Sequence, residues 1–272
     1  MNERDKVLYI SQEISPYLPD TPLSLLGKSL PQGTQEKGYE VRTFMPKYGC
    51  INERRNQLHE VIRLSGMNVI IDDTDHPLII KVATLQPSRM QVYFIDNDDY
   101  FHFSPDKTLE IVSSPDDNDE RLMFFSRGVI ETVKKLRWNP ALVHCLGWVS
   151  ALIPLFAKRM YADDPTFASS KIVYALHDAD FKQPLDPRLR EKLEMMQFDP
   201  DDLKTLGEGP VDYLTLNKLA MDFADAITAT SDKVDPALIE YARSTGKPFM
   251  EYSADEDPMI ERYADFYKTI TE

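Results

Sequence analysis

The sequence predicts an α/β fold built on a mostly parallel sheet with helices on both of its faces. Short apolar segments typical of buried strands alternate with amphipathic segments typical of helices along most of the 272 residues. Hydrophobic residues make up 42% of the chain, which is enough for a sizeable core and argues against extensive disorder. The length suits one large domain or two small ones.

The first crossover of this sheet is predicted between residues 6 and 49. Val7 to Ile10 is a short apolar run of strand-forming residues, as expected for a buried parallel strand. Thr21 and Pro22 then form a strong helix start, with a hydroxyl at the N-cap and proline at the first helical position. Glu40 to Met45 is the predicted second strand.

Residues 51–115 show a different pattern, in which turn-prone groups such as Asp72 to Asp75 separate short strand-like runs. Because no helix intervenes, this pattern predicts a small antiparallel insertion beside the main sheet. The predicted strands are Val61–Leu64, Val69–Ile71, Leu78–Thr84 and Gln91–Ile95.

The second half of the chain returns to alternating helices and strands. Asn118–Leu136 is a long amphipathic helix, and a polar segment from Asp178 to Gly209 interrupts the later pattern. The other predicted elements are the strand Leu142–Cys145, the helix Val149–Met160, the strand Lys171–Leu176, the helical stretch Pro187–Met196, the helix Leu214–Asp225, the strand Ala226–Ala229, a helix starting at Asp235-Pro236, a strand within Lys247–Tyr252, and a last helix, capped by Asp257-Pro258, with Ile260, Tyr263, Tyr267 and Ile270 on one face.

The start of the first helix has two interpretations. An open helix N-terminus can bind phosphate through its free N–H groups and its dipole. Here Pro22 has no N–H, the Thr21 hydroxyl can occupy another, and Asp20 places a negative charge where an anion would bind. Gly27-Lys28-Ser29 resembles the end of a phosphate-binding P-loop, but it lies inside the predicted helix and the first glycine of that motif would fall at Pro22. These features favour a structural, capped helix start.

Composition excludes several classes of partner. The net charge of −14 argues against binding to nucleic acid or to anionic membrane surfaces, which attract basic patches. No apolar stretch approaches the roughly 20 residues of a membrane span. The charged start MNERDK leads directly into a strand and only two cysteines occur, so we expect no signal peptide and a reducing cytoplasm. The acidic pairs at residues 73–75 and 178–180 are typical of turns, so we expect no metal and no cofactor.

Several distinct motifs are distributed along most of the chain. They are Lys6–Gly49, Tyr93–Asp96 with Asp99–Phe101, Asp117–Arg121 with Phe124–Arg127, Trp138–Pro140 with Val143-His144, Tyr161–Pro165 with Phe167-Ala168, and Ala224–Thr228 with Ser231. Together they resemble the N-terminal domain of bacterial glycogen and starch synthases, glycosyltransferase family 5, over about residues 6–233. The resemblance implies a single Rossmann-like, doubly wound, mostly parallel sheet, the N-terminal half of a GT-B glycosyltransferase. It implies one domain over residues 1–272, standing alone without the C-terminal donor-binding domain, with the helix in residues 254–272 packing back on it.

The resemblance breaks in the loop that meets the sugar nucleotide in that family. The family's Lys-x-Gly-Gly-Leu motif corresponds to residues 19–23, where Pro19, Thr21 and Pro22 replace the lysine and both glycines. This change implies that the usual contact to the donor is lost.

Two further family motifs are altered. The family's His-Asp-Trp corresponds to Leu146, Gly147 and Trp148, so an imidazole near the transferred sugar is replaced by an aliphatic side chain. The family's His-Asn-x-x-Tyr-Gln-Gly corresponds to residues 177–183, in which only His177 is retained.

Six candidate contacts to sugar or glucan are carried over from the family, and most also have a structural interpretation. Asp117 could orient sugar hydroxyls or cap the following helix. His144 lies at the C-terminal end of a predicted strand and His177 directly after another, where ligands bind in open α/β sheets; a buried core histidine is the favoured interpretation for His144 and an equal alternative for His177. Trp148 could stack on a sugar ring or pack in the core. The six residues are Asp117, Asn118, Arg121, His144, Trp148 and His177.

Three functions are compatible with these residues. The resemblance implies a glucosyltransferase of glycogen synthesis that uses ADP-glucose and an α-1,4-glucan, here needing a partner chain to supply the donor half. The altered motifs favour instead a non-catalytic module, in effect a pseudoenzyme, that binds glucan or another protein. A third alternative is an enzyme acting on another small sugar in the residual crevice.

Overall fold

The computed structural model describes residues 6–101, 117–178, 181, 183–254 and 259–271. A ten-stranded sheet follows the order β10-β9-β8-β7-β1-β2-β6-β5-β3, and β4 pairs with β5 beside this path. The strands from β10 to β6 run parallel, which confirms the predicted mostly parallel sheet. The strands are β1 (Lys6–Ser11), β2 (Glu40–Pro46), β3 (His59–Glu60), β4 (Met67–Ile71), β5 (Thr74–Leu85), β6 (Met90–Asp96), β7 (Leu142–Leu146), β8 (Lys171–Leu176), β9 (Ala226–Ala229) and β10 (Phe249–Met250).

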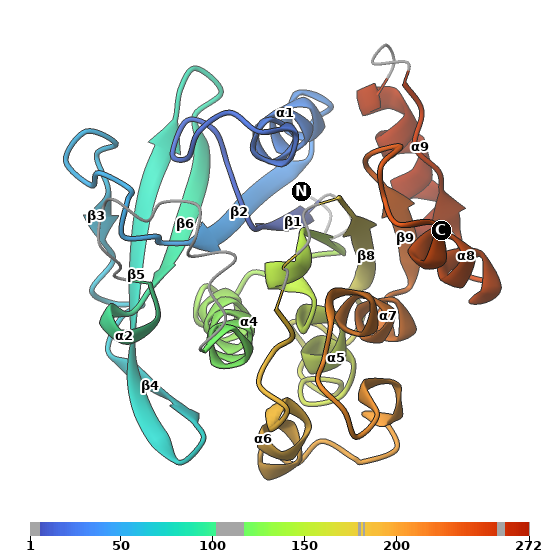
Figure 1. Ribbon diagram of the computed structural model, residues 1–272. Coiled ribbons are helices and arrows are strands. Elements are labelled where there is room, and N and C mark those ends of the chain that lie inside the picture. Colours follow the sequence, from blue (N-terminus) through green and yellow to red (C-terminus); the bar gives the residue numbers. More distant parts are fainter. Residues whose placement is uncertain (1–5, 102–116, 179–180, 182, 255–258, 272) are drawn as a thin grey trace.

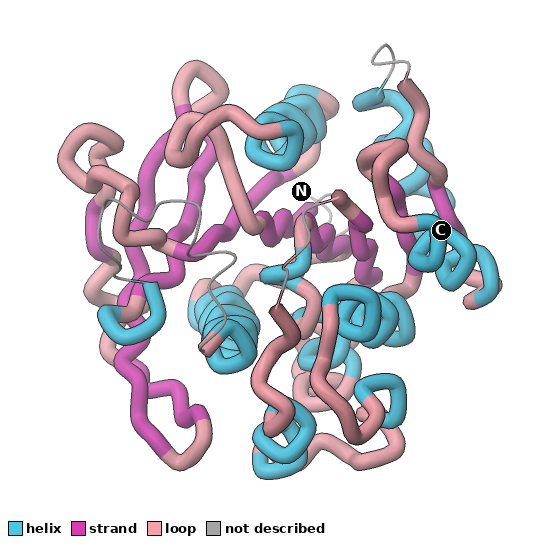
Figure 2. Tube along the Cα trace, in the orientation of Figure 1, coloured by secondary structure: helices cyan, strands magenta, loops and turns pink. Residues whose placement is uncertain are grey.

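Helices cover both faces of the sheet (Figures 1 and 2). Two of them, α1 and α9, lie on one face, while α4, α5 and α7 lie on the other, as expected for a doubly wound sheet. The helices are α1 (Pro22–Glu36), α2 (Asp98–Phe101), α4 (Asn118–Lys135), α5 (Ile153–Lys158), α6 (Leu189–Met195), α7 (Tyr213–Phe223), α8 (Pro236–Ser244) and α9 (Met259–Thr271), with 3-10 turns at Trp148–Ser150 and Lys204–Leu206. Within the described ranges, no helix has both the length and the apolar character needed to cross a bilayer.

The segment between β2 and α4 is more closely joined to the sheet than the sequence predicts. Strand β6 pairs in parallel with β2, so it belongs to the main sheet, and β5 pairs with β6 in antiparallel register from Ile79↔Asp96 to Leu85↔Met90. The antiparallel part therefore extends the main sheet at one edge. The predicted strand at Val61–Leu64 is wrong, because these residues form a turn after the short strand β3.

Two other predicted elements are shorter than expected. The predicted helix Val149–Met160 divides into a 3-10 turn and α5, which has Pro154 in its first turn. Proline favours the first turn of a helix but cannot continue one, so the helix starts beside it. The strand predicted within Lys247–Tyr252 is reduced to two residues. The predicted cap at Asp257-Pro258 lies outside the described residues.

Helix α9 lies on the sheet face that also carries α1. It buries Tyr263, Tyr267 and Ile270, which the sequence placed on one face. The hydroxyls of Tyr267 and Tyr9 are 2.9 Å apart, and the Tyr9 hydroxyl also shares a hydrogen bond of 2.7 Å with Thr34 of α1. The α9 helix is therefore held to β1 and α1 by polar contacts inside an apolar layer.

Helix α1 approaches the loop after β1 at Gly27, where a side chain would not fit. An ideal Cβ at Gly27 would lie 2.3 Å from the backbone oxygen of Glu13. Backbone atoms cannot move aside as a flexible side chain can, so the absence of a side chain at Gly27 allows α1 to pack this closely against the loop after β1. The Gly27-Lys28-Ser29 sequence thus lies inside a helix and has a packing role.

We expect Gly27→Ala to destabilise the protein by up to about 2 kcal/mol, because an overpacking cost of about 1–3 kcal/mol outweighs the roughly 1 kcal/mol that alanine gains over glycine in a helix. Urea unfolding measures this change. Gly209→Ala is the matched control, since a Cβ at this exposed position would meet nothing within 4 Å. A Gly27→Ala variant as stable as the unmodified protein would contradict the close approach.

Candidate site at the carboxyl edge of the parallel strands

The loop after β1 places a buried carboxylate at the carboxyl edge of the sheet. Glu13 is 7% exposed, and it accepts hydrogen bonds from the Thr21 hydroxyl at 2.7 Å and from the Gln12 amide at 3.3 Å. Ligands of open α/β sheets bind at this edge, which makes Glu13 a candidate site residue. Sequence reasoning missed it, although an acidic residue two positions after the end of a buried parallel strand is a recognisable signal.

The N-terminus of α1 is closed by its own residues. The Thr21 hydroxyl accepts a hydrogen bond from the Ser24 N–H at 3.0 Å, and the Ser24 hydroxyl accepts one from the Thr21 N–H at 2.8 Å. This reciprocal pair is a capping box, and Pro22 contributes no N–H. The Ser24 hydroxyl also donates to the carbonyl of Pro19 at 2.9 Å. The Thr21 and Ser24 N–H groups are therefore used within the helix start, as the capped interpretation predicts.

Charge at this end of α1 is negative. Asp20 is exposed, and its carboxylate accepts a hydrogen bond from Ser15 at 2.8 Å. The Thr21 hydroxyl, which could otherwise donate to a ligand, donates to Glu13 instead. Two carboxylates thus flank the position at which the helix dipole would favour an anion.

His177 lies at the end of β8 on the same edge. Its Nδ1 is 2.7 Å from the Thr230 hydroxyl and its Nε2 is 3.3 Å from an Asp178 carboxylate oxygen. Burial lowers the pKa of His177 below its ordinary value, while the carboxylates of Asp178 and Glu13 oppose that shift. His177 is thus held as a neutral imidazole that can exchange hydrogen bonds with a polar ligand.

The turn after β7 packs tightly against the loop after β1. Leu146 is fully buried, and Gly147 has a φ of 84°, a conformation that favours glycine. A Cβ at Gly147 would lie 2.8 Å from the side chain of Gln12. Trp148 is 4% exposed and its ring meets Phe181 edge-to-face at 4.8 Å. This arrangement matches the core interpretation of Trp148.

His144 does not lie at the edge of the sheet. It is fully buried in β7 beneath α9, where its Nδ1 hydrogen-bonds the Tyr267 hydroxyl and its ring stacks on Tyr9 with centroids 5.5 Å apart. Burial lowers the pKa of His144 to about 3. The structure therefore places His144 as a neutral core residue, away from the other candidates.

Asp117, Asn118 and Arg121 form a second candidate group at the start of α4. Arg121 Nη1 donates to the Asn118 amide oxygen at 2.8 Å, and Arg121 Nε donates to the carbonyl of Tyr100 at 2.8 Å. Asp117 occupies the N-cap position, but its carboxylate pairs with Arg121 and makes no side-chain cap hydrogen bond. Asn118 is 2% exposed and Arg121 7%, so their mutual contacts fix the group.

The described residues contain no cluster of three or more His, Cys, Asp or Glu side chains arranged to hold a metal ion. Asp73 lies in the turn between β4 and β5 with a φ of 62°. Of the second acidic pair, Asp178 contacts His177, and Asp180 lies outside the described residues.

Comparison with known proteins shows that this chain is similar to starch and glycogen synthases. A family profile for the starch synthase catalytic domain matches residues 6–243. Glycogen synthase from Chlorobaculum parvum is 36% identical over 227 residues, which cover 83% of this chain and 46% of that protein. Glycogen synthase from Chlorobaculum tepidum is 36% identical over 238 residues, covering 86% and 47%. The chain thus spans about half the length of the curated relatives it matches.

A solved structure shares the fold. The catalytic domain of starch synthase IV from Arabidopsis thaliana, bound to ADP and acarbose, aligns with a TM-score of 0.69 over 91% of this chain and 51% of that chain. The two sequences are 18% identical, so the similarity establishes the α/β architecture alone.

Proposed function

The chain belongs to the starch synthase catalytic domain family, and from this premise we propose that it is a glucan-binding domain that does not transfer glucose from ADP-glucose on its own. It is a glycogen or starch synthase-like glycosyltransferase domain with the fold of the N-terminal half of a GT-B enzyme. Its place in α-1,4-glucan metabolism and its lack of independent transfer activity are the parts that we propose.

The closed N-terminus of α1 is the observation that carries the proposal. A diphosphate would need free N–H groups or a cation there, but the Ser24 N–H is bonded to the Thr21 hydroxyl and Pro22 has no N–H. The Thr21 hydroxyl is bonded to Glu13, whose carboxylate would repel phosphate. Each missing charge-assisted hydrogen bond removes roughly 1.5–3 kcal/mol of binding, a factor of about 10 to 150 in affinity.

A neutral glucan is compatible with the same edge of the sheet. Carboxylate and imidazole groups such as Glu13 and His177 hydrogen-bond sugar hydroxyls, and a neutral ligand is not repelled by the net charge of −14. The Asp117, Asn118 and Arg121 group provides planar polar side chains of the same kind. These residues support glucan recognition without supporting binding of the sugar nucleotide.

Calorimetric titration tests this function. We expect heat of binding with maltoheptaose and none at micromolar concentration with ADP-glucose. Micromolar binding of ADP-glucose would favour the glucosyltransferase alternative, in which a partner chain completes the donor site. If neither maltoheptaose nor ADP-glucose binds, the proposal is overturned and a module that binds another protein is favoured.

Reopening the helix start should change ligand preference. We expect the triple variant Pro19→Lys/Thr21→Gly/Pro22→Gly to bind ADP-glucose at least tenfold more tightly than the unmodified chain, because it restores a cation and frees N–H groups. Ser29→Gly, at an exposed position further along α1, controls for loosening of the helix. A triple variant that folds but binds ADP-glucose no better than this control would argue that α1 is not the barrier.

A further inference from the structure

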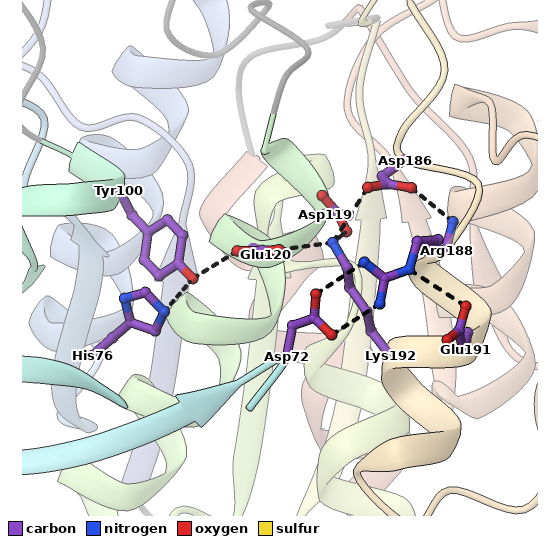
Figure 3. A network of polar contacts seen from close by, with 9 residues as sticks. All are labelled: Asp72, His76, Tyr100, Asp119, Glu120, Asp186, Arg188, Glu191 and Lys192. Carbon is purple, nitrogen blue, oxygen red and sulfur yellow. Dashed lines mark hydrogen bonds and ion pairs between the residues drawn. The ribbon is translucent and has the colours of Figure 1, made fainter. Parts of the chain in front are cut away.

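A buried ammonium group joins α6 to the start of α4 (Figure 3). The side chain of Lys192 is 3% exposed, and its Nζ lies 2.7 Å from Asp119, 2.7 Å from Glu120 and 3.4 Å from Asp186. Asp119 is itself fully buried. Burial alone would lower the pKa of Lys192, but hydrogen bonds to Asp119 and Glu120 raise it, so the group stays charged.

Tyr100 connects Lys192 to the candidate group on α4 through hydrogen bonds at its hydroxyl and at its backbone carbonyl. The second oxygen of Glu120 accepts a hydrogen bond from the Tyr100 hydroxyl at 2.9 Å. The Tyr100 carbonyl accepts one from Arg121 at 2.8 Å, and Arg121 in turn donates to Asn118 at 2.8 Å. The ammonium group therefore fixes side chains that hold this candidate group, without belonging to it.

The other end of this connection belongs to the segment that follows His177. Helix α6 is anchored in the core by the buried Leu189 and Leu193. On the outside, Arg188 makes a two-point ion pair with Asp72 of the β4–β5 turn, at 3.0 and 3.1 Å (Figure 3). Arg188 is about half exposed, so this outer pair contributes little compared with the buried one.

We propose that Lys192 is a positioning residue for glucan recognition, which sets the α4 group relative to α6. This inference rests on the proposed function and deepens it, because it identifies a buried ion pair that fixes the positions of the proposed sugar-binding side chains at the start of α4. The buried ammonium group is held by three carboxylates, of which Asp119 is fully buried and the other two are partly exposed, and loss of the charge would leave those carboxylates to repel one another.

The alternative is that Lys192 only stabilises the fold. The two roles differ in what they change in the folded protein. A stabilising ion pair affects the unfolding midpoint but leaves the Kd for glucan unchanged at temperatures where every variant is fully folded. A positioning residue affects the Kd under the same conditions, and a conservative cation restores it.

The test is calorimetric titration of maltoheptaose into the folded full chain, with circular dichroism to set a temperature at which each variant is folded. We expect Lys192→Met to weaken the Kd at least tenfold and Lys192→Arg to stay within about threefold of the unmodified chain. Arg188→Ala, at the N-cap position of the same helix, is the matched control, because it breaks the exposed pair and keeps Lys192, and its Kd should stay within about twofold. If Lys192→Met does not fold, the charge-neutral pair Asp119→Asn/Lys192→Gln replaces it under the same criterion.

The outcomes distinguish failure of the positioning role of Lys192 from failure of the proposed glucan-binding function. A folded Lys192 variant whose Kd equals that of the unmodified chain overturns the positioning role and leaves the proposed function standing. An unmodified chain that does not bind maltoheptaose overturns both.

Discussion

Removal of residues 254–272 should abolish most of the stability of this protein. Helix α9 buries Tyr263, Tyr267 and Ile270 against the sheet face, with exposures of 5%, 2% and 9%. Burial of a large apolar side chain contributes about 1.5–3 kcal/mol, so three of them contribute roughly 5–9 kcal/mol. The net stability of a typical domain is only about 5–15 kcal/mol, so a loss of this size leaves little of the folded state.

The loss has a polar part as well as an apolar one. Without α9, the Tyr9 hydroxyl loses Tyr267, and the buried imidazole of His144 loses its hydrogen-bond partner. In the Tyr267→Phe variant, which keeps α9, the His144 imidazole would stay buried without this partner at a cost of about 1–3 kcal/mol, whereas the Tyr9 hydroxyl would keep Thr34. Tyr267→Phe isolates this part, and we expect it to lower the free energy of unfolding by about that amount.

Chemical denaturation and thermal melting measure both changes. The control is Asp265→Ala/Lys268→Ala, which alters two exposed positions of α9 and should change stability by no more than about 0.5 kcal/mol. Unchanged melting of the truncated chain would show that α9 is not part of the cooperative core.

Local sequence signals predicted the helix and strand ends that depend on local chemistry. Thr21-Pro22 and Asp235-Pro236 both start helices, with side-chain caps where the residue types predict them. The strands Lys171–Leu176 and Ala226–Ala229 match their predicted limits, because buried parallel strands are short apolar runs bounded by polar residues.

Pairing between distant segments was less predictable. Strand β6 joins β2 in parallel, although its own neighbours in the sequence suggested a separate antiparallel unit. Val61–Leu64 has strand-forming residues, but it forms a turn. This turn connects β3 with β4, and these two strands pair with different parts of β5. Tertiary pairing outweighed local propensity at both places.

In the candidate site, too, the features set by local sequence were predictable, and those set by contacts between distant residues were not. The closure of the α1 N-terminus followed from residue types alone, since a hydroxyl, a proline and an acid at a helix start have known effects. The role of Glu13 did not, because only the fold shows that Thr21 donates to it. Lys192 contacts Asp119 and Glu120, which precede it in the sequence by 73 and 72 positions, and no spacing rule predicts pairing over such a separation.

Acid should destabilise the protein through His144, and the direction follows from its environment. Burial lowers the pKa of His144 to about 3 in the folded state, whereas an unfolded chain has a histidine pKa near 6.5. Between these values the unfolded state binds the extra proton, so stability is lost as the pH falls from about 6.5 toward 3. The loss is about 1.4 kcal/mol per pH unit for this one residue. His177, whose pKa is also lowered by burial, contributes in the same direction.

The variant His144→Phe isolates this contribution, because phenylalanine fills the buried site and does not titrate. Its stability at pH 7.5 should be lower than that of the unmodified chain, since the Tyr267 hydroxyl loses one of its two partners and keeps only Tyr9. Relative to the unmodified chain, the variant should regain about 1.4 kcal/mol for each pH unit below 6.5, or about 3 kcal/mol by pH 4.5. Urea unfolding at a series of pH values measures the difference, and the exposed His59→Gln is the control. A difference that does not vary with pH would mean that His144 is charged or reaches water in the folded protein, which is incompatible with its burial beneath α9.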